Sequence, residues 1–292
     1  MELLQRISQV IIPVFFIVGI GYFYARRNAP DMTVFNRIAL DVLAPVLVYS
    51  ALASRDFHLM NHLPLLAGGT VLIVGGGLLA WPLARAFGTQ PRTLVPVVMF
   101  NNCGNMGLPL AVLAFGQEHL GAAVALFSIS NLLHFSIGAR ITSSHAHTRD
   151  LLLSPLMLAT ALGFASALTD IRPPELMLSG MRLLGDSMLP IMLFALGVRL
   201  TALTRSGVAI GMLGAIARPL TGLVIALPLA WAMGFEGVVK GQLLLFAALP
   251  PAVMQYLLAE RYNQEPEKVA AMILLGNVLS VVFIPLALAM VL

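Results

Sequence analysis

The stretch VVMFNNCGNMGLPL, Val97 to Leu110, interrupts an apolar sequence that begins at Leu94 and continues to Phe115. The residues that disfavour a regular helix here are Asn101, Asn102, Gly104, Asn105, Gly107 and Pro109. With apolar sequence on both sides, this pattern predicts a helix that is broken partway across a membrane. Backbone at that depth is tolerated only where protein or a water-filled cavity provides partners for its N–H and C=O groups. Transporters use such broken helices to build a solute site near the centre of the bilayer.

The composition of the chain is that of a membrane protein. Its 292 residues are 59% hydrophobic and 10% charged, with a mean hydropathy of +0.92, which excludes an ordinary soluble domain. The net charge of +4 does not indicate nucleic-acid binding, because Lys and Arg lie singly near span ends. With one cysteine, the chain has neither an internal disulfide nor a multi-cysteine metal site. We expect no cofactor and no metal, and no cleaved signal peptide.

The hydropathy pattern predicts an all-α protein with ten membrane spans, since a span needs about 20 mostly apolar residues. The expected spans are 7–25, 35–53, 63–84, 93–115 (broken), 120–141, 151–169, 176–199, 208–233, 239–260 (broken) and 269–291. The loops after odd-numbered spans carry eleven of the 17 Lys and Arg residues, the other side carries five, and Arg218 lies inside span 8. Because cytoplasmic loops are enriched in these residues, both termini are expected outside the cytoplasm.

The chain resembles itself at an offset of about half its length. Four pairs recur in order, at offsets of 145 or 146: Asp41-x-x-x-Pro45 with Asp186-x-x-x-Pro190, Pro82 with Pro228, Phe100 with Phe246, and Asn131 with Asn277. The counterpart of the first break contains Pro250 and Pro251, and adjacent prolines break a helix. Residues 1–146 and 147–292 would thus be two five-span repeats. An odd number of spans per repeat gives them opposite orientations, which is the inverted-repeat plan of secondary transporters.

The chain also resembles the auxin efflux carrier family along its full length. The resemblance is carried by LDVLAPVLVYSALAS (40–54), FNNCGNMGLPLAVLAFG (100–116), SPLMLATALGF (154–164) and LLGDSMLPIMLFALGVRL (183–200). It implies the fold of bile-acid and sodium symporters, in which broken spans 4 and 9 cross. It also implies a scaffold of spans 1, 2, 6 and 7, a transport domain of spans 3–5 and 8–10, a homodimer, and transport of a small organic anion.

The two breaks supply the expected solute-binding residues. Asparagine amides can donate to a carboxylate, glycine allows close backbone approach, and the N-terminus of a half-helix favours an anion. The expected binding residues are Asn101, Asn102, Gly104, Asn105, Asn131, Pro250, Pro251, Gln255 and Asn277. For Asn131 and Asn277, hydrogen bonding between helices is an equal alternative.

Three charged residues are placed within spans, where charges are costly and normally have a partner. Asp41 and Asp186 are interpreted either as proton-coupling sites or as carboxylates that complement a helix N-terminus. Arg218 lies about 16 Å into span 8. It is expected to bind the substrate or to form an ion pair with Asp186 or Asp41.

The sequence therefore predicts a secondary carrier for a small carboxylate that works by elevator-like alternating access. It contains no GxxxxGK[ST] nucleotide loop. Proton or sodium coupling, as in a symporter, or the membrane potential would drive transport. The alternatives are a passive anion channel and, remotely, an intramembrane aspartyl hydrolase that uses Asp41 and Asp186.

Overall fold

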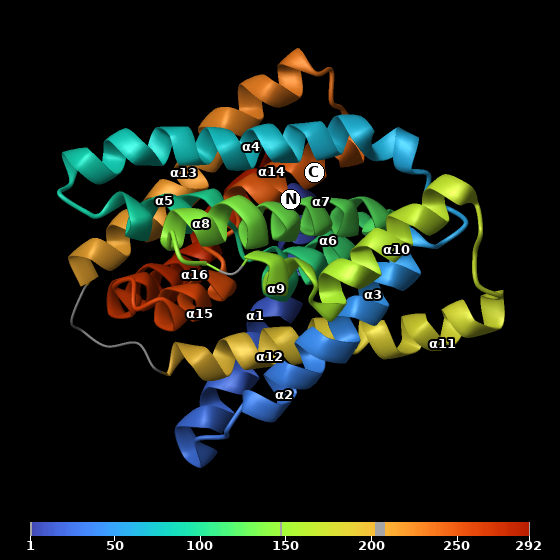
Figure 1. The fold of residues 1–292 in the computed structure, drawn as a ribbon, viewed down its shortest axis with the longest axis horizontal. Coiled ribbons are helices and arrows are strands. Elements are labelled where there is room, and N and C mark those ends of the chain that lie inside the picture. The colour runs from blue at the N-terminus through green and yellow to red at the C-terminus, as the bar shows by residue number, and fades with distance from the viewer. Residues whose placement is uncertain (1, 147, 202–207, 292) are drawn as a thin grey trace.

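The computed structural model describes residues 2–146, 148–201 and 208–291, and these form helices without any strand. The chain is therefore all-helical, as predicted. Figure 1 shows the helices in chain order. Their bounds are α1 Glu2–Asn28, α2 Thr33–Ile38, η1 Ala39–Leu43, α3 Ala44–Leu52, α4 Leu59–Ala86, α5 Pro91–Met99, η2 Cys103–Gly107, α6 Leu108–Phe115, η3 Gln117–His119, α7 Leu120–Leu133, η4 His134–Gly138, α8 Ala139–Thr142, α9 Thr148–Leu152, α10 Pro155–Thr169, α11 Glu175–Asp186, α12 Met188–Leu200, α13 Val208–Ala232, α14 Gly237–Ala248, α15 Val253–Arg261 and α16 Pro266–Ala289.

Seven helical stretches in the described part of the chain are long and apolar enough to cross a membrane. They are Ile7–Asn28, Thr33–Leu52, Leu59–Ala86, Gln117–Thr142, Glu175–Leu200, Val208–Ala232 and Pro266–Ala289. Three shorter apolar helices accompany them, and they cover Cys103–Phe115, Pro155–Thr169 and Gly237–Ala248. These shorter helices overlap predicted spans 4, 6 and 9.

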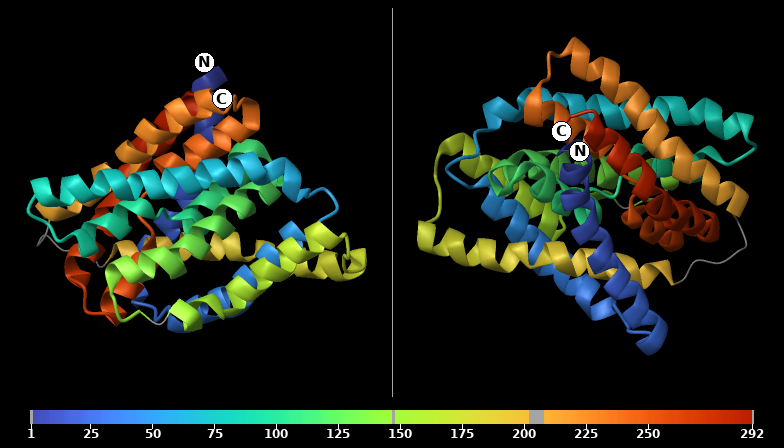
Figure 2. Two further views of the ribbon diagram at one scale, coloured as in Figure 1. Left: turned by 45° about the horizontal axis from the view of Figure 1, so that its top comes forward. Right: turned by 180° about the vertical axis from the view of Figure 1, so that it is seen from behind.

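The helices pack in two groups. In the first group α1 lies along α12, and α3 packs against α10 and α11. In the second group α4 packs against α5, α7 and α13, and α16 packs against α13, α14 and α15. The two views in Figure 2 show the first group along one side of the second. The start of α1 and the end of α16 lie next to each other in both figures.

The chain leaves its helical path at two places that lie against each other. Helix α5 ends at Met99, and Phe100 is extended (φ −108°, ψ 131°) before η2 begins at Cys103. Helix α14 ends at Ala248 because Leu249 precedes a proline, which favours extended backbone (ψ 147°). The two breaks pair in antiparallel fashion between Asn101 and Pro251. The Asn102 N–H donates to the Pro250 carbonyl (2.8 Å), and the Ala252 N–H donates to the Phe100 carbonyl (2.9 Å).

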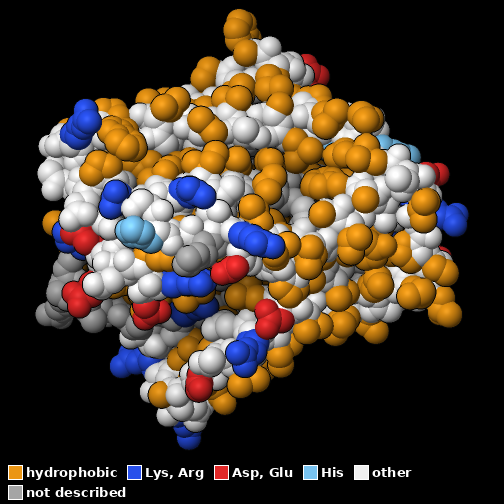
Figure 3. Space-filling model, viewed as in Figure 1, with side chains coloured by type: hydrophobic (Ala, Val, Ile, Leu, Met, Phe, Trp, Pro, Cys, Tyr) orange, Lys and Arg blue, Asp and Glu red, His pale blue; other side chains and the backbone are white. Residues whose placement is uncertain are grey.

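Charged side chains are unevenly spread over the face of the molecule that Figure 3 shows. In Figure 3 Lys, Arg, Asp and Glu gather on the left of the view, where α8, α9 and α15 lie. Hydrophobic side chains cover most of the remaining face, including α4. A broad apolar surface with charges collected at one end is typical of a membrane protein. Arg205, which contributes to the predicted loop charge between spans 7 and 8, lies outside the described residues.

Candidate functional site

A cavity of about 290 Å³ lies where the crossed breaks meet the first helix group. We call it the crossover cavity. One wall comes from the first group: α2, η1, α3, α10 and α12. The opposite wall comes from the two breaks with η2 and α15, and from α7 and η4. The stretch singled out in the sequence therefore forms part of one wall of a cavity between the two helix groups.

Two helix N-termini face the crossover cavity. Its lining includes Cys103, Gly104 and Asn105, which begin η2, and Ala252, Val253 and Met254, at the start of α15. The first N–H groups of a helix have no partner within that helix. They also carry the positive end of the helix dipole. The cavity therefore receives backbone donors from both breaks, an arrangement suited to an anion.

The asparagines of the first break have different roles. Asn101 Nδ2 donates to the Phe246 carbonyl (2.6 Å), and Asn102 Nδ2 donates to Asn277 Oδ1 (3.1 Å). These bonds tie the first break to α14 and α16. Asn101 Oδ1 is buried and has no partner among the described residues. Asn105 is half-buried, lines the cavity, and has no hydrogen-bond partner in the same part of the chain. It is the amide best placed to meet a solute.

Asn277 and Gln255 join helices, whereas the amide of Asn131 bonds within its own helix. Asn277 donates to the Ile273 carbonyl (2.8 Å) while accepting from Asn102, and it lies behind Asn102 without lining the cavity itself. Asn131 lines the cavity but its amide nitrogen binds the Phe127 carbonyl (2.8 Å). Gln255 is fully buried, 2.9 Å from His134 Nε2, and donates to Thr142 Oγ1 (3.0 Å). Asn277 and Gln255 therefore form hydrogen bonds between helices, which is the alternative to solute binding.

The prolines of the second break support the crossing and do not line the cavity. The Pro250 carbonyl accepts from the Asn102 backbone, and Pro251 forms the bridge with Asn101. Both rings pack where a Cβ on Gly276 of α16 would lie, 2.5 Å from Pro251 Cδ. Gly104, by contrast, lies in the lining. Of the nine expected binding residues, the structure brings to the cavity Asn101, Asn102, Gly104, Asn105 and Asn131.

The crossover cavity contains a cation that the sequence analysis missed. Arg199, in the last turn of α12, is the one charged residue among the described residues that line the cavity, and none of these is a carboxylate. Arg199 forms none of the ion pairs found among the described residues. Its position near a loop made it look like an orientation signal. Only the packing of α12 against η2 reveals that it reaches the cavity. Thr33 and Asn36 of α2 also line the cavity, and the sequence did not single them out because only the packing of the helices brings them there.

The two intramembrane aspartates lie apart from this cavity. Asp41 is in the π-helical turn η1 inside the continuous helix Thr33–Leu52, and its side chain is exposed. It is beyond the first turn, so complementing a helix N-terminus does not describe Asp41. Asp186 ends α11 directly before α12 and is 3.4 Å from Gln117 Nε2. One is exposed and the other lines a different cavity, so the paired-aspartate hydrolase has no catalytic pair.

Arg218 also differs from expectation. It is 1% exposed in α13, and it donates to backbone carbonyls at the end of α14. The Nη1 atom is 3.0 Å from the Ala247 carbonyl, and Nη2 is 3.2 Å from the Phe246 carbonyl. The expected ion pair with Asp41 or Asp186 is absent from the described residues. Arg218 does not line the crossover cavity either. Its charge is placed at a helix C-terminus, which favours a cation.

A second cavity, of about 410 Å³, lies at the other end of the same helices. We call it the α11 cavity. It is lined by the end of α3, the start of α7 and the Asp186 end of α11. The crossover cavity is lined instead by the start of α2, the end of α7 and one face of α12 from Met188 to Arg199. The charged lining of the α11 cavity is mixed, with Asp56, Glu118, Asp186 and Arg182.

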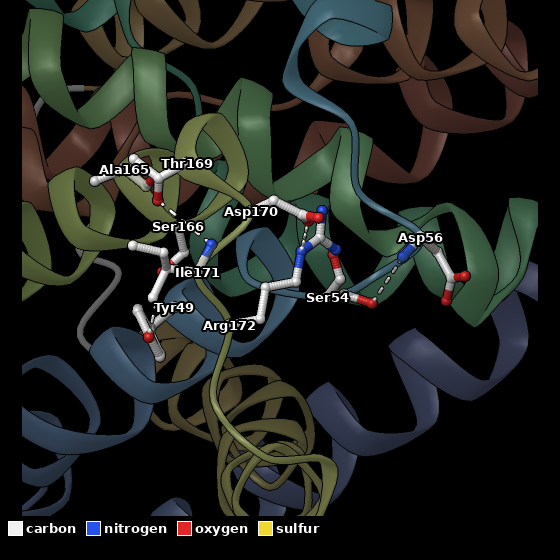
Figure 4. Close-up of polar contacts among 9 residues, drawn as sticks. All are labelled: Tyr49, Ser54, Asp56, Ala165, Ser166, Thr169, Asp170, Ile171 and Arg172. Atoms are coloured by element: carbon white, nitrogen blue, oxygen red, sulfur yellow. Dashed lines mark hydrogen bonds and ion pairs between the residues drawn. The ribbon is translucent and has the colours of Figure 1, made fainter.

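One rim of the α11 cavity is tied down by polar contacts. Figure 4 shows Arg172, after α10, bonded to the Ser54 carbonyl after α3 and to Asp170 (2.8 Å). The hydroxyl oxygen of Tyr49 on α3 lies 3.4 Å from Ser166 Oγ on α10. These contacts join the ends of α3 and α10 within the first helix group. The α11 cavity therefore lies beside this joined rim, and the crossover cavity lies at the crossed breaks.

Comparison with known proteins agrees with this geometry. The sequence matches the membrane transport protein family over residues 6–146 and 139–288, which together cover almost the whole chain. The chain belongs to this family. It is the auxin efflux carrier family whose motifs the sequence resembles. The protein is therefore a multi-pass membrane transport protein and not an enzyme.

Three curated relatives match along nearly their full lengths. A protein of Rhizobium meliloti is provisionally named as a malonate transporter. It is 25% identical to this chain, over 95% of this chain and 93% of its own length. An uncharacterized transporter of Methanothermobacter thermautotrophicus is 24% identical over 96% of both chains. An uncharacterized transporter of Methanocaldococcus jannaschii is 23% identical over 95% of this chain and 96% of its own.

Proposed function

We propose that this protein is a secondary active carrier for a small carboxylate, which it binds in the crossover cavity and moves by alternating access. The observation that carries the proposal is the charge of that cavity. It combines two helix N-termini and Arg199, and the described residues that line it include no carboxylate. Each of these features lowers the cost of bringing an anion out of water. A cation would be repelled by them, and a neutral solute would gain weaker hydrogen bonds than an anion.

The substrate that we propose is a dicarboxylate of the size of malonate. The name of the Rhizobium meliloti relative suggests malonate itself. One carboxylate would lie at the N-termini of η2 and α15, beside Asn105. The second would meet Arg199 on the opposite wall, because a guanidinium binds a carboxylate with two parallel hydrogen bonds. A cavity of about 290 Å³ accommodates such a solute with some water.

Alternating access is supported by the pairing of the two breaks and by the two cavities. We propose ten spans in two inverted repeats, with α1, α2–α3 and α10–α12 as scaffold and α4–α8 and α13–α16 as transport domain. Gly76 and Gly222, 146 residues apart, each lie against the end of a broken helix: Gly76 against Val98 and Met99, and Gly222 against Ala247. In such repeats the site is carried between two openings. The crossover cavity and the α11 cavity are the expected openings.

The remaining features of the proposal concern the membrane and assembly. We place both termini outside the cytoplasm of a bacterial inner membrane, with the crossover cavity on the cytoplasmic side. An ion gradient, of protons or sodium, or the membrane potential would drive transport. The exposed Asp41 on an apolar helix supports a homodimer, because a carboxylate at this depth is unfavourable against lipid.

The test is a thermal-shift screen of the purified protein with malonate and other small carboxylates at two pH values. A ligand that binds the folded protein raises its melting temperature. We expect stabilisation by small dicarboxylates and none by neutral or cationic solutes of similar size. Stabilisation by a cation alone would overturn the anion proposal. Exchange of labelled malonate against unlabelled malonate across proteoliposomes then distinguishes a carrier from a channel, which shows conductance without trans-stimulation.

A further inference from the structure

Arg218 is a buried charge without a carboxylate partner. It is 1% exposed, and it takes part in none of the ion pairs among the described residues. Taking an unpaired cation out of water is costly, and a membrane protein retains one only where other groups compensate it. The groups that do so here are the Phe246 and Ala247 carbonyls at 3.2 and 3.0 Å. The guanidinium Nε has no partner in the described part of the chain.

Phe246 and Ala247 directly precede Ala248, the last residue of α14, after which the second break begins. The end of a broken half-helix carries unpaired carbonyls and the negative end of its dipole. In secondary transporters, such half-helix ends and unwound carbonyls are where a coupling sodium ion is coordinated. In this protein the place is filled by a side chain.

Resting on the carrier function proposed above, we propose that Arg218 is a built-in cation that takes the place of a coupling sodium ion, so that carboxylate binding needs no sodium. The guanidinium lies on the α14 side of the break, and the α15 N-terminus lies on the cavity side. Its positive charge therefore offsets that of the bound anion across the break. Asn101 joins the two sides, because its amide nitrogen shares the Phe246 carbonyl with Arg218.

The first half of the chain has no equivalent cation. The position 146 residues before Arg218 is Leu72 in α4, which is buried and apolar. Yet the neighbouring glycines correspond, since Gly76 and Gly222 let α4 and α13 approach the ends of α5 and α14. The same backbone arrangement thus carries a leucine at one break and an arginine at the other. This asymmetry indicates that the charge is not required to make a broken helix.

The first experiment measures malonate affinity of the wild-type protein by thermal shift in sodium chloride and in choline chloride. We expect the apparent Kd to differ by less than about twofold, which is under about 0.4 kcal/mol. Affinity that requires sodium in the wild-type protein would overturn the inference. If malonate and the other carboxylates bind in neither salt, the carrier proposal itself fails.

The second experiment removes the built-in cation with Arg218→Ala. In choline we expect the apparent Kd for malonate to rise at least about tenfold. Sodium or guanidinium chloride should restore much of this affinity, and sodium should raise the melting temperature of the ligand-free variant. Arg218→Lys keeps a charge at the site and should bind without sodium. Arg85→Ala removes an exposed arginine at the end of α4 as a matched control.

The outcomes separate the two proposals. Unchanged malonate affinity of Arg218→Ala in choline would overturn the built-in cation and leave the carboxylate site intact. Loss of affinity that neither sodium nor guanidinium restores would likewise overturn the replacement of a sodium ion. Should Arg218→Ala fail to fold, Arg218→Lys decides in its place, because sodium-dependent binding by that variant contradicts the inference.

Discussion

Asn105 and Arg199 line opposite walls of the crossover cavity. Among the described residues, Asn105 has no hydrogen-bond partner and Arg199 has no ion-pair partner. Asn101 and Asn102, by contrast, use their amide nitrogens to join helices. A substitution at Asn105 or Arg199 should therefore change binding with little effect on folding. The same change at Asn102 would also break a contact between the first break and α16.

Asn105→Leu tests the amide. Leucine has the same branched shape and number of heavy atoms but can neither donate nor accept, so an anion loses a hydrogen bond and meets an apolar group. We expect the apparent Kd for malonate to rise at least about tenfold, with an unchanged melting temperature of the ligand-free protein. Asn28→Leu, at the exposed end of α1, is the control. Normal affinity in Asn105→Leu would remove the first break from the binding site.

Arg199→Gln tests whether the opposite wall binds the second carboxylate. A charge-assisted pair is lost for malonate but not for its monomethyl ester, which has one charged end. We expect about a tenfold loss of malonate affinity and less than about a threefold loss for the ester. Arg85→Gln serves as the control for removal of a positive charge. An equal loss for both ligands would show that Arg199 does not distinguish dianions.

The limits of prediction at this scale follow from the type of signal. The clustering of Asn, Gly and Pro at 101–109 located a wall of the cavity because such residues are rare in apolar sequence. The pattern could not separate Asn105 from Asn102, since both are asparagines in one break and only their distances to other helices differ. Arg199 was not found because a single arginine near a span end is common.

At the scale of helices, α13 and α14 approach closely at Gly222. A Cβ there would lie 2.1 Å from the Ala247 carbonyl oxygen, which is backbone and cannot move aside. Gly222→Ala should therefore separate the two helices and destabilise the protein by about 1–3 kcal/mol. The measurement is the melting temperature of the ligand-free protein. Gly180→Ala in α11 is the control, since nothing lies within 4 Å of its Cβ. An equal effect of both substitutions would contradict the close approach.

The connection between α15 and α16 is fastened to the start of α5. Thr93 Oγ1 donates to Glu265 (2.5 Å), and Lys268 forms an ion pair with the same carboxylate. Burial acts to raise the pKa of Glu265, but the hydrogen bonds from Lys268 and Thr93 outweigh it, so the pKa lies below its ordinary value of 4.5. Stabilisation by this carboxylate is therefore present above the ordinary pKa and is lost as pH falls through the lowered one.

Glu265→Gln should consequently lower the melting temperature at neutral pH, and the difference from wild type should shrink as the buffer is acidified below the ordinary carboxyl pKa. Thermal unfolding over a pH series measures this. Glu267→Gln, an exposed glutamate in the first turn of α16 without a partner among the described residues, should give a smaller difference. A difference for Glu265→Gln that grows on acidification would contradict the assigned direction.

Most helices could be predicted because long apolar runs admit few alternatives. The breaks were predictable from Pro250, Pro251 and the asparagine cluster. The π-helical turns η1, η2 and η4 were not, since they depend on packing more than on residue type. The same holds for Asp41, which was interpreted as a proton-coupling site or as a carboxylate at a helix N-terminus, and whose exposure on η1 follows from packing.

At the scale of the whole molecule, the crossover and α11 cavities lie at opposite ends of shared helices. One buried serine lines each cavity, Ser130 the crossover cavity and Ser50 the α11 cavity, so a label at each position measures access to one cavity. Cys103 is the only cysteine. Thus, in a Cys103→Ser background, Ser130→Cys and Ser50→Cys each give a single thiol through a conservative change. Oriented vesicles and a membrane-impermeant maleimide then measure access from each side.

If the protein alternates between two openings, the two thiols should react from opposite membrane faces. Ser130→Cys should react from the cytoplasmic face, where the loops after odd-numbered spans are expected. A transported dicarboxylate that shifts the equilibrium between the openings should change the two labelling rates in opposite directions, because one opening closes as the other forms. Labelling of both thiols from one face would contradict the inverted arrangement. Rates that malonate lowers together, by blocking one continuous path, would instead support a channel.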